Sequence, residues 1–300
     1  MTASNPFTLT FGRKPENFIS RHEITASIID TFCNSSLSQT YLIEGVRGSG
    51  KTVLMTSIAS ELKEDSGWIV VNLNPSLDLL DNLAKRLHDV PKDKKVLITI
   101  DDVKRDKYMR TFASQFQIFL REDYPLYLIM TGLAENIFEI QNDPALTFLL
   151  RSPKVEMEPL SKLQITRKYS ELLGIDEEKA RKLACLTKGY AFAYQALGAV
   201  YWPDRENPNM EAILGKLDEM LDDYVYKKIW SSLTAKEREI ILAIKHDDTK
   251  TGEICEVTGI KPNSFSQYKS KLTRMGLITS SGYGYNSLTL PRFYEIVRLY

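Results

Sequence analysis

The chain has 300 residues, more than one hydrophobic core usually carries, so we expect two or three domains. Hydrophobic residues make up 43% and charged residues 26% of the sequence, which is ordinary for a globular protein and excludes a disordered or fibrous chain. The 39 basic and 39 acidic residues cancel, so overall charge predicts neither a nucleic-acid nor a membrane partner, and any nucleic-acid surface must be local.

Residues 45–52 fit the phosphate-binding loop pattern G-x-x-x-x-G-K-[ST]. The loop follows residues 41–44, a short apolar run typical of a buried strand, and precedes a segment with apolar residues at helical spacing. Its glycines permit backbone conformations that a Cβ would forbid, so that successive N–H groups can point at phosphate oxygens. We therefore predict that the loop and the residue after it bind ATP or ADP. The predicted binding residues are Gly45, Val46, Arg47, Gly48, Ser49, Gly50, Lys51, Thr52 and Val53.

The last two loop residues have distinct expected roles. The phosphates would lie at the N-terminus of the following helix, where unpaired N–H groups and the helix dipole favour negative charge. We expect Lys51 to reach the β- and γ-phosphates as a catalytic residue and the Thr52 hydroxyl to bind Mg²⁺. A glycine-rich turn before a helix also occurs without a ligand, but the complete match between a strand and a helix favours nucleotide binding.

A second apolar, β-branched run, residues 96–100, ends in two adjacent acids. A carboxylate at the C-terminal end of such a strand can hold the Mg²⁺ shell, and we assign this role to Asp101. Asp102 would then polarise the attacking water. The alternative is that both acids only cap the strand and solvate the loop after it.

Strand and helix patterns alternate up to about residue 158. Further strands are expected at residues 68–72 and 127–131, and helices at 77–87 and 108–121. Such alternation predicts a parallel sheet covered by helices, with the nucleotide at the carboxyl ends of the strands. The predicted fold class is therefore α/β, with a P-loop NTPase sheet in residues 1–158.

Beyond residue 158 the strand signal disappears. Residues 159–161 are interpreted as a hinge, and residues 159–228 as an all-helical lid, because their apolar residues recur at helical spacing. The expected lid helices are 165–173, 177–187, 191–200 and 210–222, the last after a Pro- and Asn-rich turn.

Residues 229–300 predict a winged-helix domain. Thr234 is the expected N-cap of a first helix, a short second helix ends at Gly259, and a third runs to Gly276. Residues 277–290 are then expected to form a hairpin. This order of three helices followed by a hairpin is that of a winged helix.

In that plan the third helix enters the major groove of double-stranded DNA. The side chains that can bond bases or phosphates there are Asn263, Ser264, Ser266, Gln267, Lys269, Lys271 and Arg274. Residues 250–300 carry a net charge of +4, which is modest for a DNA-binding module. A winged helix that packs or docks on a protein is therefore the alternative.

The phosphate loop, the strand closing in Asp101 and Asp102 and the strand ending at Thr131 resemble the core of AAA+ and STAND-type P-loop ATPases. The nearest resemblance is to single-chain ATPases related to origin-recognition initiators. Residues 18–23 are similar to the F-x-G-R-x-x-E box of these proteins, which implies that Phe18 and Arg21 contact the nucleotide, although a serine replaces the glycine.

The resemblance implies two further catalytic positions. Thr131 occupies the place of the polar sensor of the γ-phosphate, and Arg151 that of the arginine finger offered to a neighbouring subunit. An arginine that closes a helix C-terminus is the alternative for Arg151. Residues 188–192 resemble the segment that opens the lid helix, but no arginine follows at the second-sensor position. This departure favours a switch or a slow ATPase over a processive motor.

Two functions follow from these patterns. In the first, ATP binding closes the hinge and reorients the winged helix, so that a slow ATPase controls DNA binding. In the second, a STAND-like signalling ATPase uses its winged helix for protein contacts, including self-association. A kinase is less favoured, because the lid offers no convincing arginine pair for a transferred phosphate.

Cysteine and histidine usage bears on the compartment. Cys33, Cys185 and Cys255 show no metal-ligand spacing and cannot all pair within one chain, which favours a reducing, cytoplasmic environment. The histidines do not cluster, so a histidine metal site has no support. The N-terminus lacks a secretory pattern, and no stretch approaches the roughly 18 apolar residues of a membrane span, so we expect no membrane partner.

Overall fold

A computed structural model describes residues 4–9, 14–35, 37–75, 83, 85, 87–88, 90–91, 93–245 and 247–300. Most of the helix expected at 77–87 lies outside these residues. The chain forms two compact units. We call Ser20–Gly45 with Gly50–Met157 the sheet unit, and Met1–Ile19, Val46–Ser49 and Glu158–Tyr300 the helical unit.

The sheet unit is built on five parallel strands in the order β2-β3-β4-β1-β5. They are β1 (Thr40–Glu44), β2 (Trp68–Leu73), β3 (Lys95–Ile100), β4 (Leu126–Gly132) and β5 (Lys154–Glu156). Every residue of the central strand β4 is buried, as expected for a strand covered on both faces. Strand β4 separates β1, which leads into the phosphate loop, from β3, which ends in the two acids. The predicted parallel α/β fold is confirmed.

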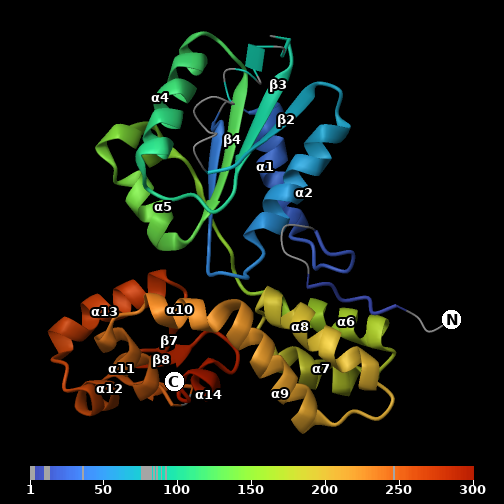
Figure 1. The fold of residues 1–300 in the computed structure, drawn as a ribbon, viewed down its shortest axis with the longest axis vertical. Coiled ribbons are helices and arrows are strands. Elements are labelled where there is room, and N and C mark those ends of the chain that lie inside the picture. Colours follow the sequence, from blue (N-terminus) through green and yellow to red (C-terminus); the bar gives the residue numbers. More distant parts are fainter. Residues whose placement is uncertain are drawn as a thin grey trace. The chain divides into compact units, whose positions relative to one another are not determined.

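Helices cover both faces of this sheet (Figure 1). On one face, α1 (His22–Asn34) and α2 (Lys51–Glu64) contribute Phe32 and Ile58 to a core with Ile43 of β1. On the other, α4 (Lys107–Arg121) and α5 (Ala134–Gln141) bury Phe112 and Ile137. The 3-10 helix η1 (Pro144–Arg151) adds Leu146 and Leu149 to that second core. Because both faces are covered, the inner strands β3 and β4 are almost wholly buried and do not alternate between buried and exposed residues.

The helical unit begins with the expected lid helices. They are α6 (Lys162–Leu173), α7 (Glu177–Leu186), α8 (Ala191–Tyr201) and α9 (Met210–Leu221). The 3-10 helix η2 (Trp202–Asp204) follows α8, and the π-helix η3 (Asp222–Tyr226) and the short α-helix α10 (Lys227–Ser232) follow α9. Residue Phe7 packs into this core, with its ring edge-on to Tyr169 and Tyr194 at 5.9 and 5.8 Å between centroids. The sequence pattern did not predict that the N-terminal residues would pack against the lid helices.

The rest of the helical unit has the winged-helix order of elements. It comprises α11 (Ala235–Ala243), β6 (Thr249–Lys250), α12 (Thr251–Thr258), α13 (Pro262–Arg274), β7 (Ile278–Gly282), β8 (Tyr285–Leu288) and α14 (Phe293–Val297). Thr234 and Glu237 form a reciprocal capping box at the start of α11. Gly259 ends α12 in the left-handed conformation that glycine favours. The small strand β6, which the sequence pattern did not predict, pairs with the hairpin in the order β6-β8-β7.

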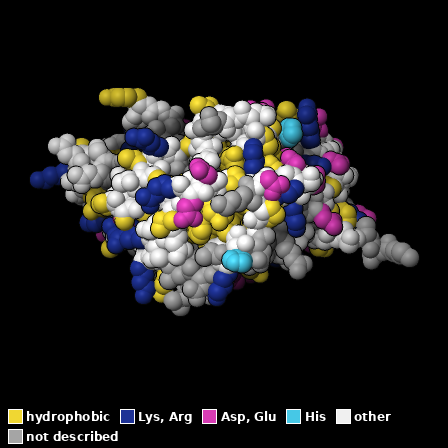
Figure 2. Space-filling view, turned by 90° about the horizontal axis from the view of Figure 1, so that it is seen from above, with side chains coloured by type: hydrophobic (Ala, Val, Ile, Leu, Met, Phe, Trp, Pro, Cys, Tyr) yellow, Lys and Arg dark blue, Asp and Glu magenta, His cyan; other side chains and the backbone are white. Residues whose placement is uncertain are grey.

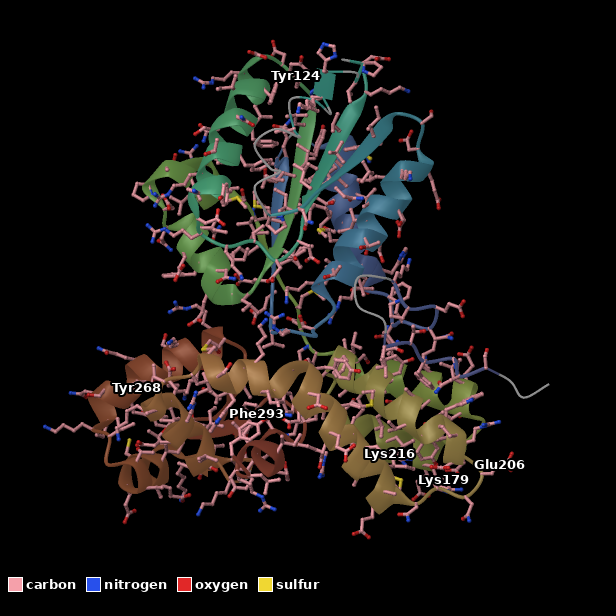
Figure 3. The ribbon with its side chains drawn as sticks, viewed as in Figure 1. Tyr124, Lys179, Glu206, Lys216, Tyr268 and Phe293 are labelled. Carbon is pink, nitrogen blue, oxygen red and sulfur yellow. The ribbon has the colours of Figure 1, made fainter. Side chains whose placement is uncertain are left out.

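One hydrophobic core runs through the whole helical unit, across the predicted boundary at residue 228. The Tyr226 hydroxyl donates to the Pro291 carbonyl at 2.7 Å, and its ring lies 4.9 Å from that of Phe293 in the interior (Figure 3). Arg292 is paired with Asp218 of α9. The separation into lid and winged helix therefore stays a prediction from the sequence pattern.

Charged and hydrophobic side chains are intermixed on the face of the molecule that Figure 2 shows. No helix among the described residues is both long enough and apolar enough to cross a membrane.

Candidate nucleotide-binding site

Two glycines shape the phosphate loop. Gly48 and Gly50 have φ angles of 77° and 94°, in the left-handed region that favours glycine, and Gly50 is the N-cap of α2. Gly45 is not among the glycines with positive φ. The Lys51 ammonium donates to the Gly45 carbonyl oxygen at 2.9 Å, so this side chain folds back over the loop. Val53 lies half-buried in the first turn of α2.

One buried loop hydroxyl tests whether the loop fits an anion. Ser49 is only 6% exposed, and its side-chain Oγ has no hydrogen-bond partner among the described residues. A buried hydroxyl without a partner is costly, and such groups in proteins are usually satisfied. A phosphate oxygen would satisfy this donor, so the loop fits the group that its sequence predicts.

Three elements bring their oxygen atoms together next to the loop. The Thr52 hydroxyl of α2 donates to Asp101 Oδ2 at 2.8 Å, and the Thr131 hydroxyl of β4 donates to Asp101 Oδ1. These contacts arise because β4 lies beside β3, so that Thr131 sits near the acid that ends β3. One carboxylate and a hydroxyl are hard ligands of the kind Mg²⁺ accepts when phosphates and water complete its shell. No cluster of three or more His, Cys, Asp or Glu ligands exists among the described residues.

Asp102 lies apart from this group. Its side chain is exposed, and its φ of 52° places it in the left-handed region, which aspartate tolerates better than most residues. Its backbone N–H donates to Asp101 Oδ1 at 3.1 Å and to the Thr131 hydroxyl at 3.3 Å. The backbone of Asp102 is thus tied to the site while its carboxylate faces solvent.

The remaining predicted nucleotide residues lie in three places. Phe18 is half-buried in the helical unit, with Lys14 Nζ 4.5 Å from its ring centroid. Arg21 is the half-buried N-cap residue of α1 in the sheet unit. Arg151 is exposed at the end of η1, and within the described part of the chain its side chain makes no hydrogen bond or ion pair. The structure therefore does not bring Arg151 into the Asp101 group.

The predicted DNA residues are not all alike on α13. Asn263, Ser264, Ser266, Gln267 and Arg274 are exposed and Lys269 is half-buried. Lys271 differs: its ammonium lies 2.7 Å from a Glu237 carboxylate whose side chain is only 2% exposed. The Lys271 side chain is itself 40% exposed, and its charge is partly neutralised by this buried acid. Its contact with DNA stays a prediction.

Two contacts at the tip of the phosphate loop were missed by sequence reasoning. The Tyr190 hydroxyl donates to the Arg47 carbonyl at 2.6 Å, and the Phe192 N–H donates to the Gly48 carbonyl at 3.1 Å, all within the helical unit. The resemblance of residues 188–192 to a lid-opening segment marked this stretch but gave no role to Tyr190. A tyrosine beside an apolar helix is usually assigned to the core, so the sequence offered no specific signal.

Comparisons with known proteins agree with this geometry. Residues 12–118 match the family model Novel STAND NTPase 5, and residues 223–297 match a domain of unknown function, DUF8462. No curated protein matches the chain in sequence.

Several solved structures share the fold. A Walker-type ATPase of Pyrococcus abyssi is 13% identical with a TM-score of 0.63, covering 95% of this chain and 97% of that one. The ORC2 protein of Aeropyrum pernix, in ADPNP–ADP complexes, is 13% identical with a TM-score of 0.66, covering 97% and 96%. The ORC1 protein of Aeropyrum pernix, in complex with DNA, is 15% identical with a TM-score of 0.51, covering 97% and 96%. The chain thus shares its fold with these solved structures, and residues 12–118 are similar to a STAND NTPase family, in agreement with the resemblance of its motifs.

Proposed function

We propose that the chain binds ATP and ADP with Mg²⁺ through residues 45–53 and acts as a nucleotide-dependent switch. The observation that carries this proposal is the convergence of Thr52, the last residue of the phosphate loop, and Thr131 on the Asp101 carboxylate. The positive φ angles of Gly48 and Gly50 in the loop support it. Lys51 would contact the β- and γ-phosphates, and Thr52 and Asp101 would hold Mg²⁺. Bound Mg²⁺ supplies positive charge that offsets the phosphate oxygens.

We further propose slow ATP hydrolysis. The exposed Asp102 carboxylate would polarise the attacking water, and Thr131 would sense the γ-phosphate through the hydroxyl that it now gives to Asp101. Turnover would be slow because the lid segment after residue 188 carries no arginine for the phosphates. Arg151 could supply one only from a neighbouring subunit. Free phosphate released from ATP without any acceptor distinguishes hydrolysis from a kinase reaction.

The nucleotide state is proposed to control DNA binding by residues 229–300. Three observations support this part: the winged-helix order of α11 to β8, the exposed polar residues of α13, and the fold shared with an ORC1 protein solved in complex with DNA. The proposed contact residues are Asn263, Ser264, Ser266, Gln267, Lys269, Lys271 and Arg274.

Binding to random duplex DNA at several salt concentrations, with ATP, with ADP and without nucleotide, tests this proposal. Each lysine or arginine contact to phosphate contributes about 0.9 to the slope of log affinity against log salt, so Lys269→Ala and Arg274→Ala should each lower it by about that amount. Lys179→Ala, on the exposed surface of α7 (Figure 3), is the matched control and should leave the slope unchanged.

A protein-assembly switch is the second candidate. It is favoured by the STAND-family match of residues 12–118. It is also favoured by two ion pairs, Lys271 with Glu237 and Arg292 with Asp218, because they lower the positive charge available to DNA. No affinity for DNA at low salt, or a slope that both α13 variants leave unchanged, would leave only this candidate. Nucleotide-dependent self-association, measured by sedimentation, would then support it.

A further inference from the structure

The tip of the phosphate loop is bonded to the start of a lid helix. Both carbonyls at the tip, those of Arg47 and Gly48, accept a hydrogen bond, from the Tyr190 hydroxyl at 2.6 Å and from the Phe192 N–H at 3.1 Å. All four residues belong to the helical unit. The loop is therefore held from its carbonyl side by a neighbour remote in sequence.

The helix gains from the same contact. Tyr190 is the N-cap residue of α8, and its side chain does not cap its own helix. The first N–H groups of any helix lack an intrahelical partner, and Phe192 provides one of them. The Gly48 carbonyl accepts this N–H, so the loop replaces the usual capping side chain.

Tyr190 also explains why residue 48 must be glycine. A Cβ at this position would overlap the Tyr190 hydroxyl and crowd the Phe192 Cβ. Tyr190 is only 5% exposed, so it has little room to withdraw. Burial also raises the pKa of Tyr190 far above its ordinary value, so its hydroxyl keeps its proton at any working pH.

A hydrogen bond to a backbone carbonyl also fixes the direction of the N–H group of the next residue. A trans peptide group is planar, and its C=O and N–H point in opposite directions. The bond from Tyr190 to the Arg47 carbonyl therefore fixes the direction of the Gly48 N–H. The bond from Phe192 to the Gly48 carbonyl fixes that of Ser49, whose N–H also donates to the Val46 carbonyl at 3.3 Å. The loop N–H groups are the ones expected to bind phosphate.

We propose that Tyr190 is a positioning residue of the nucleotide site, which holds the Arg47 carbonyl and so keeps the Gly48 N–H in its phosphate-binding direction. This inference rests on the proposed nucleotide binding. It adds a residue outside the phosphate-loop sequence that sets affinity for the nucleotide. It also gives the lid helix α8 a direct part in the conformation of the loop.

Tyr190→Phe tests the proposal, because it removes the hydroxyl and keeps the ring against Gly48. Calorimetric titration with Mg·ADP should show about a fivefold loss of affinity, the equivalent of one neutral hydrogen bond. Amide exchange of a peptide covering residues 46–49 should be faster than in the wild type without nucleotide. Thermal melting checks that the variant is folded.

Tyr169→Phe is the matched control. Its hydroxyl donates to the Tyr194 carbonyl at 2.7 Å inside the same unit, and it is equally buried, but it does not contact the loop. Affinity for ADP and exchange of residues 46–49 should be unchanged in this variant. Unchanged affinity and exchange in Tyr190→Phe, or equal losses in both variants, would overturn the proposal.

The exchange measurement separates this inference from the proposed function. If the wild type binds no nucleotide, nucleotide binding as a function fails. Faster exchange of residues 46–49 in Tyr190→Phe would still show that the hydroxyl holds the loop, and unchanged exchange would show that it does not.

Discussion

At the residue scale, the two adjacent acids at the end of β3 have different environments. Asp101 accepts hydroxyls from both Thr52 and Thr131, whereas the Asp102 carboxylate is exposed. The Asp101 carboxylate, held by two hydroxyl donors, suits the binding of Mg²⁺, whereas the solvent-facing Asp102 carboxylate suits contact with the attacking water.

We predict that Asp102→Asn leaves the affinity for ATP within about twofold and lowers turnover at least about tenfold, since a general base typically contributes 10² to 10⁴. Affinity is measured by calorimetry and turnover by phosphate release. Asp101→Asn is the companion variant, and it should weaken the Mg²⁺ dependence of binding. Normal turnover in Asp102→Asn would move the water-activating role to another residue.

Gly198 on α8 shows a second requirement for glycine. A Cβ at this position would overlap the Phe7 ring, which is buried against Tyr169 and Tyr194. We predict that Gly198→Ala lowers the free energy of unfolding by about 1–3 kcal/mol, the usual effect of overpacking. Chemical denaturation measures it.

Gly215 on α9 is the matched control for that substitution. It is exposed, and a Cβ there meets nothing within 4 Å. Gly215→Ala should therefore raise stability by about 0.5–1 kcal/mol, since alanine favours a helix interior. If both variants changed stability in the same direction, the packing of Phe7 against α8 would not be the cause.

The motif residues could be predicted one by one, but the contacts between distant residues could not. Lys51, Thr52 and Asp101 follow from a pattern in which the chemistry of phosphate binding dictates residue type and spacing. Tyr190 and Phe7 act through partners more than 140 residues away in the sequence, which no local pattern encodes. The ion pair of Lys271 with Glu237 could not be predicted either, because the two residues lie on different helices, α13 and α11.

At the element scale, the 3-10 helix η1 is anchored by a buried acid. Asp143 caps it by accepting the Ala145 N–H at 2.9 Å, and its side chain is only 1% exposed. Arg105 and Arg110 lie 2.7 and 2.8 Å from the same carboxylate. The hydrogen bond from Arg105, with help from the Ala145 N–H and Arg110, holds the pKa of Asp143 well below its ordinary value.

This shift predicts a pH dependence of stability with a definite sign. A carboxyl group with a lowered pKa in the folded state stabilises the fold above its unfolded value, about pH 4, and that stabilisation is lost as the pH falls further. Asp143→Asn should therefore melt at a lower temperature than the wild type at pH 7, and the difference should shrink below pH 4. Glu122→Gln, at an exposed position, should match the wild type. A difference that is constant with pH would contradict the role of the charge.

Element type was predictable where periodicity was strong, and element pairing was not. The strands at residues 68–72, 96–100 and 127–131 and the lid helices form close to their expected bounds, because buried strands and amphipathic helices have distinct apolar patterns. The placement of β4 between β1 and β3 could not be derived, since strand order depends on crossover connections and not on local sequence. The two-residue strand β6 is too short to show a pattern.

At the scale of the whole molecule, residues 46–49 belong by their contacts to the helical unit, although the loop is flanked in sequence by β1 and α2 of the sheet unit. The loop is bonded to the lid helix α8 through Tyr190 and Phe192, so the nucleotide binding that we propose would act directly on the helical unit. A ligand shifts a conformational equilibrium only if its binding free energy differs between the two conformations. The hydrogen bonds from Tyr190 and Phe192 to the loop are contacts through which nucleotide binding would favour one conformation of the helical unit.

The proposed switch depends on binding of a magnesium-chelated nucleotide by the phosphate loop. Calorimetric titration of the whole chain with Mg·ATP and Mg·ADP measures this binding. We predict saturable binding of both nucleotides by the wild type. Lys51→Ala should lower the affinity at least about 100-fold, because it removes the charge-assisted contacts to the phosphates. Lys63→Ala, which removes an exposed lysine at the other end of α2, should bind normally. Absence of binding for both nucleotides in the wild type, or equal binding in Lys51→Ala, would contradict the proposed switch.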